Sequence, residues 1–217
     1  MFFPMLWPLI FLFLFIPVLL ASFFLNLAVF SFAKLGLSPL GALALLLASI
    51  VGSLINIPIS RRRIYHQPWP ENIFFFFFYY PPRVNYQLIC INVGGAVIPI
   101  LFSLYLLLTG RAPLGPASLA TLVITVVSKA LARVVPGLGI SLPTFIPPIM
   151  AALAALLVAP HDAAPVAYVA GALGTLLGAD ILNLRALSRL QAQVVSIGGA
   201  GVFDGIFLVA LAAALLS

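Results

Sequence analysis

The chain has 217 residues, of which 64% are hydrophobic and 6% are charged, against about 25% charged in an ordinary soluble domain. This composition excludes a water-soluble fold. A net charge of +6 from scattered lysines and arginines is too small for a nucleic-acid surface, so no nucleic-acid partner is expected. One cysteine, two histidines and four acidic residues offer few metal ligands, and we expect neither a metal nor another cofactor. The sequence therefore predicts a multi-pass protein whose main partner is the lipid bilayer.

Seven apolar stretches are candidate membrane crossings, because about 20 helical residues cover a hydrocarbon core of about 30 Å. The first stretch contains Pro17, where we expect a kink unless the start of the helix lies in the membrane interface. We predict an all-α, polytopic transmembrane helix bundle of about seven spans, forming a single integral membrane domain over residues 1–217. The predicted spans are 8–33, 39–59, 87–108, 114–133, 144–159, 164–184 and 194–216.

The basic residues predict the orientation of this bundle. If all seven segments cross, eight of the ten lysines and arginines fall on one side, and the positive-inside rule places that side and the N-terminus in the cytoplasm. We therefore expect a protein of a prokaryotic cytoplasmic membrane. The eight are Arg61, Arg62, Arg63, Arg83, Lys129, Arg133, Arg185 and Arg189, and the other two are Lys34 and Arg111.

The longest stretch between predicted spans is a juxtamembrane loop at 60–86, which is both basic and aromatic. It contains the aromatic run Phe74 to Tyr80, which is too short to cross the bilayer. The run could form an interfacial belt, a membrane-skimming helix or a short strand, since aromatic residues favour strands. We favour an interfacial anchor beside the cluster Arg61 to Arg63.

A second irregular segment, 134–148, is apolar but rich in proline and glycine. It could be a re-entrant loop, which survives at membrane depth only when protein or water surrounds it. We favour the simpler interpretation, a tight turn followed by a helix with proline near its start.

Two aspartates lie inside predicted spans, where an ionised carboxylate is costly and therefore a functional hypothesis by default. Asp180 lies near the cytoplasmic end of the sixth span and Asp204 near the middle of the seventh. A short loop joins these spans, so we expect them to be antiparallel neighbours. Tilt or a register shift could then bring the two carboxyl groups together.

Small and polar residues surround both aspartates on a helical projection. Asn183 shares a face with Asp180, whereas Gly171, Gly174 and Gly178 form another face that offers close packing to a neighbouring helix. Beside Asp204, Gly201 would admit a backbone or a substrate.

Near the start of the third span, a polar residue and two small residues interrupt an otherwise apolar stretch. These are Asn92, Gly94 and Gly95. We expect them to pack tightly against the sixth or seventh span.

Three functions remain open from these residues. In a hydrolase, one carboxyl group keeps a proton while the other activates water for attack on a peptide carbonyl. In a proton- or ion-coupled transporter or channel, the aspartates would line the translocation pathway. In a non-enzymatic membrane scaffold, each aspartate would only tie helices together by pairing with Lys129, Asn183, Arg185 or Arg189.

Three motifs resemble an uncharacterised prokaryotic membrane family, catalogued as domain of unknown function 1614. They are INVGGAVIP at 91–99, GADILNL at 178–184 and GAGVFDGIF at 199–207, in which Gly205 directly follows Asp204. Consecutive helices that carry an Asp and a glycine-rich Asp motif are also similar to the intramembrane aspartyl proteases of the presenilin and signal-peptide-peptidase class. That second resemblance covers about residues 165–210. It implies catalytic roles for Asp180 and Asp204 alone, with a transmembrane peptide as substrate. From the polar and small residues themselves, we expect supporting roles for Asn92, Asn183, Gly201 and Gly205.

Overall fold

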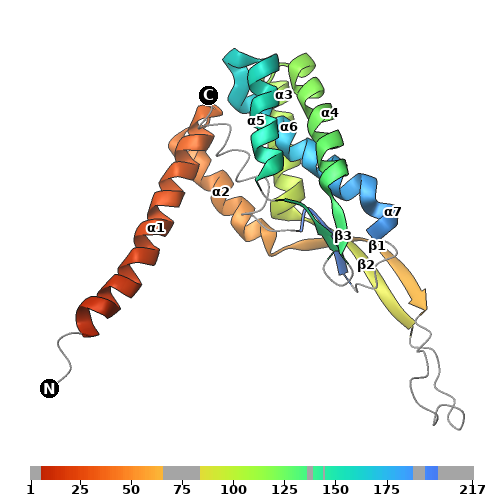
Figure 1. Ribbon diagram of the computed structural model, residues 1–217, viewed down its shortest axis with the longest axis horizontal. Helices are drawn as coiled ribbons and strands as arrows, with labels where there is room; N and C mark the ends of the chain where they lie inside the picture. Colours follow the sequence, from red (N-terminus) through yellow and green to blue (C-terminus); the bar gives the residue numbers. More distant parts are fainter. Residues whose placement is uncertain (1–5, 66–83, 136–138, 144, 188–193, 200–217) are drawn as a thin grey trace, which may run out of the picture.

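The computed structural model describes residues 6–65, 84–135, 139–143, 145–187 and 194–199. The described chain is mostly helical, with a small sheet at one end of a helix bundle (Figure 1). The longer helices are α1 (Leu6–Lys34), α2 (Pro39–Ser53), α3 (Ile98–Leu108), α4 (Leu114–Leu131), α5 (Ile146–Val158) and α6 (Ala163–Thr175). The short helical segments are η2 (Val93–Val97), η3 (Pro160–Asp162), η4 (Leu176–Asp180), η5 (Ile181–Asn183) and α7 (Leu184–Leu187). The strands are β1 (Asn56–Tyr65), β2 (Val84–Asn92), β3 (Arg133–Val135), β4 (Gly139–Ser141) and β5 (Val194–Ile197).

Three helical stretches in the described residues are long and apolar enough to cross a membrane. They are Phe11–Lys34, Leu114–Leu131 and Pro160–Asn183, and they correspond to the first, fourth and sixth predicted spans. Three shorter apolar helices, Pro39–Ser53, Val93–Leu108 and Ile146–Val158, correspond to the second, third and fifth. The chain is therefore a membrane protein, as its composition predicts. The count of seven spans stays a prediction.

The prediction of an all-α fold is wrong in one respect, because a three-stranded sheet of order β1-β2-β5 is present. β1 pairs with β2 in antiparallel register from Asn56↔Asn92 to Tyr65↔Val84, and β5 lies parallel to β2. The end of the predicted second span and the starts of the third and seventh are thus strands. Short apolar runs rich in isoleucine and valine suit either structure, and hydropathy alone does not separate them. Pro58 is tolerated because β1 is an edge strand.

The predicted juxtamembrane loop at 60–86 is largely the connection of this β1–β2 hairpin. Residues 60–65 and 84–86 belong to the two paired strands. The aromatic run Phe74 to Tyr80 lies outside the described residues. The loop is therefore shorter than predicted, and the role of the aromatic run stays a prediction.

The simpler interpretation of segment 134–148 holds for its helix, which has proline near its start, whereas the two-stranded sheet before it was not predicted and residues 136–138 and 144 lie outside the described residues. β3 pairs with β4 in antiparallel register, and α5 then begins at Ile146 with proline in its first turn. Pro147 and Pro148 fit there, because the first helical N–H groups have no intrahelical acceptor to lose.

The centre of the bundle is α6, which lies between α3, α4 and α5 (Figure 1). Its side chains are mostly alanine, glycine and valine, and most of them are buried. Tyr168 is the large exception, and it meets the rings of Phe32 and Phe102 edge-on at centroid distances of 6.2 and 4.9 Å. These three aromatic rings join α1, α3 and α6.

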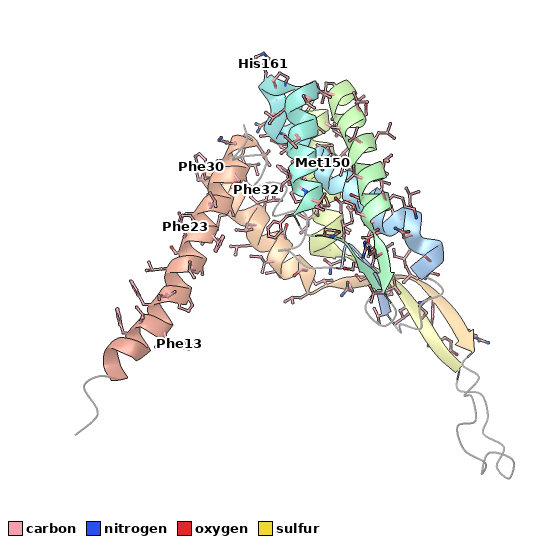
Figure 2. The ribbon with its side chains drawn as sticks, in the orientation of Figure 1. Phe13, Phe23, Phe30, Phe32, Met150 and His161 are labelled. Atoms are coloured by element: carbon pink, nitrogen blue, oxygen red, sulfur yellow. The ribbon has the colours of Figure 1, made fainter. Side chains whose placement is uncertain are left out.

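In contrast to α6, α1 stands away from the bundle along most of its length (Figure 1). It runs unbroken past Pro17. Figure 2 shows Phe13 and Phe23 on the projecting part, whereas Phe32 lies near the end that packs against the rest of the chain.

The bundle has two chemically different ends. At one end lie the turns α1–α2, α3–α4 and α5–α6, where Arg111 Nη1 donates to Leu35 O at 3.0 Å and His161 marks the tip (Figure 2). The sheet lies at the other end (Figure 1). The sheet end carries Arg61 and Arg63 on β1, Lys129 on α4 and Arg133 on β3, whereas Lys34 and Arg111 lie at the turn end. Basic residues thus gather at the sheet end, and which end faces the cytoplasm stays a prediction.

Candidate functional site

Asp180 lies where the helical bundle meets the sheet. It is the last residue of η4, a π-helical turn that continues α6 toward the sheet. Its half-buried carboxylate accepts a hydrogen bond through Oδ2 from Gly198 N at 2.7 Å. Gly198 directly follows β5, so the predicted catalytic residue contacts the segment that leads toward Asp204.

Two glycines, Gly95 in η2 and Gly198 after β5, allow their two backbone segments to approach each other closely. Gly198 has φ +68°, a left-handed conformation that favours glycine, and a Cβ there would lie 2.7 Å from the carbonyl carbon of Gly95. A Cβ on Gly95 would collide with the carbonyl oxygen of Gly198. The expected close packing of Gly95 against the seventh predicted segment is thus confirmed. Gly94 instead packs against Gly52 and its neighbours in α2, which the sequence did not predict.

Asn92 is the polar residue that holds this junction together. Its Oδ1 accepts from Gly95 N at 2.7 Å, which caps η2. Its Nδ2 donates to Ser53 O at 2.7 Å and to Asn56 Oδ1 at 3.1 Å. The buried amide therefore ties α2, β1 and η2 together. Asn92 does not contact Asp180 directly in these bonds: it binds Gly95 N, Gly95 packs against Gly198, and Gly198 N binds Asp180.

Sequence reasoning missed Asn56 and Ser196. Ser196 Oγ donates to Asn56 Oδ1 at 2.5 Å, so the two edge strands β1 and β5 are joined across the end of β2. Asn56 lies within the predicted span 39–59, and Ser196 lies near the start of the predicted span 194–216. The signal that could have identified them is that each is a polar side chain within an apolar stretch of sequence.

On the other side of Asp180, Asn183 contacts the turn that carries the aspartate. Its Nδ2 donates to Ala179 O at 2.8 Å and to Gly178 O at 3.2 Å. Its Oδ1 accepts from Lys129 Nζ at 2.5 Å, and the same ammonium donates to Leu182 O at 2.9 Å. Asn183 was a predicted supporting residue. The sequence did not predict that Lys129 contacts Asn183.

Two glycines of the predicted packing face, Gly174 on α6 and Gly178 on η4, pack closely against a neighbouring helix, which is α4. A Cβ on Gly174 would lie 2.7 Å from Ile124 Cβ, and one on Gly178 would lie 2.9 Å from Ser128 Cβ. The two backbones can approach this closely only because these positions lack side chains. The close approach also brings Lys129 to Asn183.

Three predicted site residues, Asp204, Gly201 and Gly205, lie outside the described residues. The pairing of Asp180 with Asp204 therefore stays a prediction. Within the described ranges, no three of the His, Cys, Asp and Glu residues gather closely enough to hold a metal ion.

Comparison with known protein families identifies the chain. A family model described as protein of unknown function (DUF1614) matches residues 50–216, which is well over half of the sequence. The chain belongs to this family. The DUF1614 match includes both aspartates and the three motifs that carry the resemblance. Searches of curated proteins and of solved structures found no match. The resemblance to presenilin-type proteases stays a prediction.

Proposed function

We propose that this DUF1614 protein is an intramembrane aspartyl hydrolase that cleaves a peptide bond of a membrane-embedded substrate, with Asp180 and Asp204 as its catalytic pair. One observation carries the proposal. The carboxylate of Asp180 binds Gly198 N, and Asp204 follows six residues later in the chain. Six residues span at most about 20 Å when extended and about 9 Å when helical, so the length of the connection allows Asp204 to reach Asp180.

The proposed chemistry gives each carboxyl group one role. Asp180 is the base, because an ionised carboxylate only accepts hydrogen bonds and Gly198 N supplies a donor. It takes a proton from water, whose oxygen attacks the peptide carbonyl, while protonated Asp204 donates to the carbonyl oxygen. The tetrahedral intermediate then collapses: one of its hydroxyl groups returns a proton to Asp204, the C–N bond breaks, and the leaving amine takes the proton from Asp180.

The architecture of the proposal follows from the basic residues. About seven spans with the N-terminus inside would place Lys129, Asp180 and the sheet near the cytoplasmic face of a prokaryotic cytoplasmic membrane. The substrate would be a transmembrane peptide that enters from the bilayer. Labelling of a cysteine placed at Arg63 from the outer side would contradict this orientation.

The test offers the purified full chain a panel of single-span peptides in lipid. Asp180→Asn and Asp204→Asn should each lower kcat/KM by about 100-fold to 10,000-fold, because each removes one proton-transfer group. Asp162→Asn is the matched control. Asp162 is exposed in η3, at the end of the bundle away from the sheet, and its variant should cleave at the wild-type rate.

Cleavage that persists in the double asparagine variant would overturn the catalytic assignment. The same preparations are reconstituted in liposomes to measure flux driven by a pH gradient. Flux in the wild type without any cleavage, lost in the asparagine variants, would establish the transporter alternative instead.

A further inference from the structure

The turn that carries Asp180 is wider than a regular α-helical turn. In η4, Ile181 N donates to Leu176 O, five residues back, and also to Leu177 O. Such π-turns are rare and occur frequently at functional sites. The carbonyl groups of Gly178 and Ala179, directly before Asp180, accept from the side chain of Asn183. Asn183 therefore supplies donors to the widened turn.

Asn183 is in turn held by Lys129 from the neighbouring helix. Lys129 Nζ donates both to Asn183 Oδ1 and to Leu182 O, so the ammonium sits on the carbonyl end of the α6–η4–η5 helix, where a positive charge is favoured. The contact depends on Gly178, since a Cβ there would lie 3.0 Å from Lys129 N. Because α4 packs closely on Gly174 and Gly178, the side chain of Lys129 lies within hydrogen-bonding distance of Asn183.

The width of the turn sets the direction of Asp180. A π-turn holds about one residue more than an α-turn, so its closure to a regular α-helix would rotate Asp180 by about 100° around the axis. Such a rotation would carry the carboxylate away from Gly198 N. We infer that Lys129 is a positioning residue for Asp180, which acts through Asn183 to keep η4 open and the carboxylate on Gly198. Its importance for catalysis rests on the proposed function.

Hydrogen exchange of the full chain in detergent micelles tests the inference without any need for activity. Selective glycine labelling with ¹⁵N limits the spectrum to the 16 glycines. Gly198 N reports the bond to Asp180, and Gly41 N, which donates to Ser38 Oγ at 3.1 Å, is a remote reference of the same kind. Asp180→Ala removes the acceptor and defines the full loss of protection at Gly198.

Lys129→Met should raise exchange at Gly198 about tenfold, the size expected for loss of one hydrogen bond, and leave Gly41 unchanged. Lys129→Arg keeps the charge and the donor and should restore protection. Arg133→Met is the matched control, because Arg133 is an exposed cation at the same end of the bundle. Cleavage by Lys129→Met should show kcat lower by about tenfold with an unchanged KM, because Lys129 acts on Asp180 rather than on the substrate.

Unchanged exchange at Gly198 in Lys129→Met, with a clear rise in Asp180→Ala, would overturn the inference. So would an equal rise at Gly41, which would show a general loss of stability, or an equal effect of Arg133→Met. If the wild type cleaves no peptide, the proposed function fails, while the exchange result still decides whether Lys129 positions Asp180.

Discussion

The helices α1 and α6 are both apolar, yet the protein uses them in opposite ways. In an 18-residue apolar window of Phe11–Lys34, which lies in α1, only 6% of the residues are buried, whereas the share is 67% in such a window of Pro160–Asn183, which contains α6. The stretch in α1 is the more apolar of the two, with a mean hydropathy of 2.5 against 1.5, yet it is the one that lies mostly outside the bundle. Hydrophobicity therefore identifies segments that belong in the membrane, but it does not identify the centre of the bundle.

The difference follows from the size of the side chains. Lipid tails are as apolar as leucine, so a helix gains little hydrophobic free energy by leaving lipid for protein. What remains is close van der Waals packing, which alanine and glycine permit and a surface of phenylalanine and leucine does not. α6 is rich in small residues, whereas α1 carries exposed Phe13, Phe23 and Phe24.

The largest effect is expected from a large side chain on the packed face of α6 and η4. Gly178→Leu should destabilise the protein by about 3 kcal/mol, because the new side chain meets the backbone of α4 at Thr125 and Lys129. Ala21→Leu is the control in α1, where Ala21 is exposed, and it should change stability by less than about 0.5 kcal/mol. Thermal unfolding in detergent measures both. Equal effects would show that α6 is not more tightly packed than α1.

A smaller effect should separate the two parts of α1 itself. Phe32→Ala removes a ring that is 4% exposed and packs on Phe102 and Tyr168. It should cost about 2 kcal/mol, less than the roughly 3–5 kcal/mol of such a change in a water-soluble core, because in lipid only packing contacts are lost. Phe13 is 80% exposed, and Phe13→Ala should be nearly neutral in the same unfolding experiment. A substantial loss of stability in Phe13→Ala would mean that the projecting part of α1 packs on protein in solution.

The smallest effect is expected at the turn where α1 meets α2. Arg111 Nη1 donates to Leu35 O, so Arg111→Met should cost about 1 kcal/mol, the net value of one hydrogen bond. The variant should also increase hydrogen exchange at Gly36, whose backbone the guanidinium of Arg111 contacts. Arg133→Met gives the control for loss of a positive charge. No change in either measurement would show that this hydrogen bond does not hold α1 to the bundle.

The sequence predicted the features that depend on local pattern. Composition predicted a membrane protein, since 6% charged residues is far below the roughly 25% of an ordinary soluble domain. Helical periodicity placed Gly174 and Gly178 on one packing face, and the prolines at 147 and 148 marked the start of α5. Polar side chains are energetically costly within an apolar segment, and this predicted functional roles for Asp180, Asn183 and Asn92. The structure places all three at the junction of bundle and sheet.

Only the tertiary structure decided how those residues meet. β2 and β5 pair across about a hundred residues of intervening chain, and no local signal in either run distinguishes a strand from part of a span. The bond from Gly198 to Asp180 and the reach of Lys129 to Asn183 each need two segments in contact. Local pattern fixes what a segment can bury, whereas hydrogen bonds between distant segments fix where each polar group finds its partner.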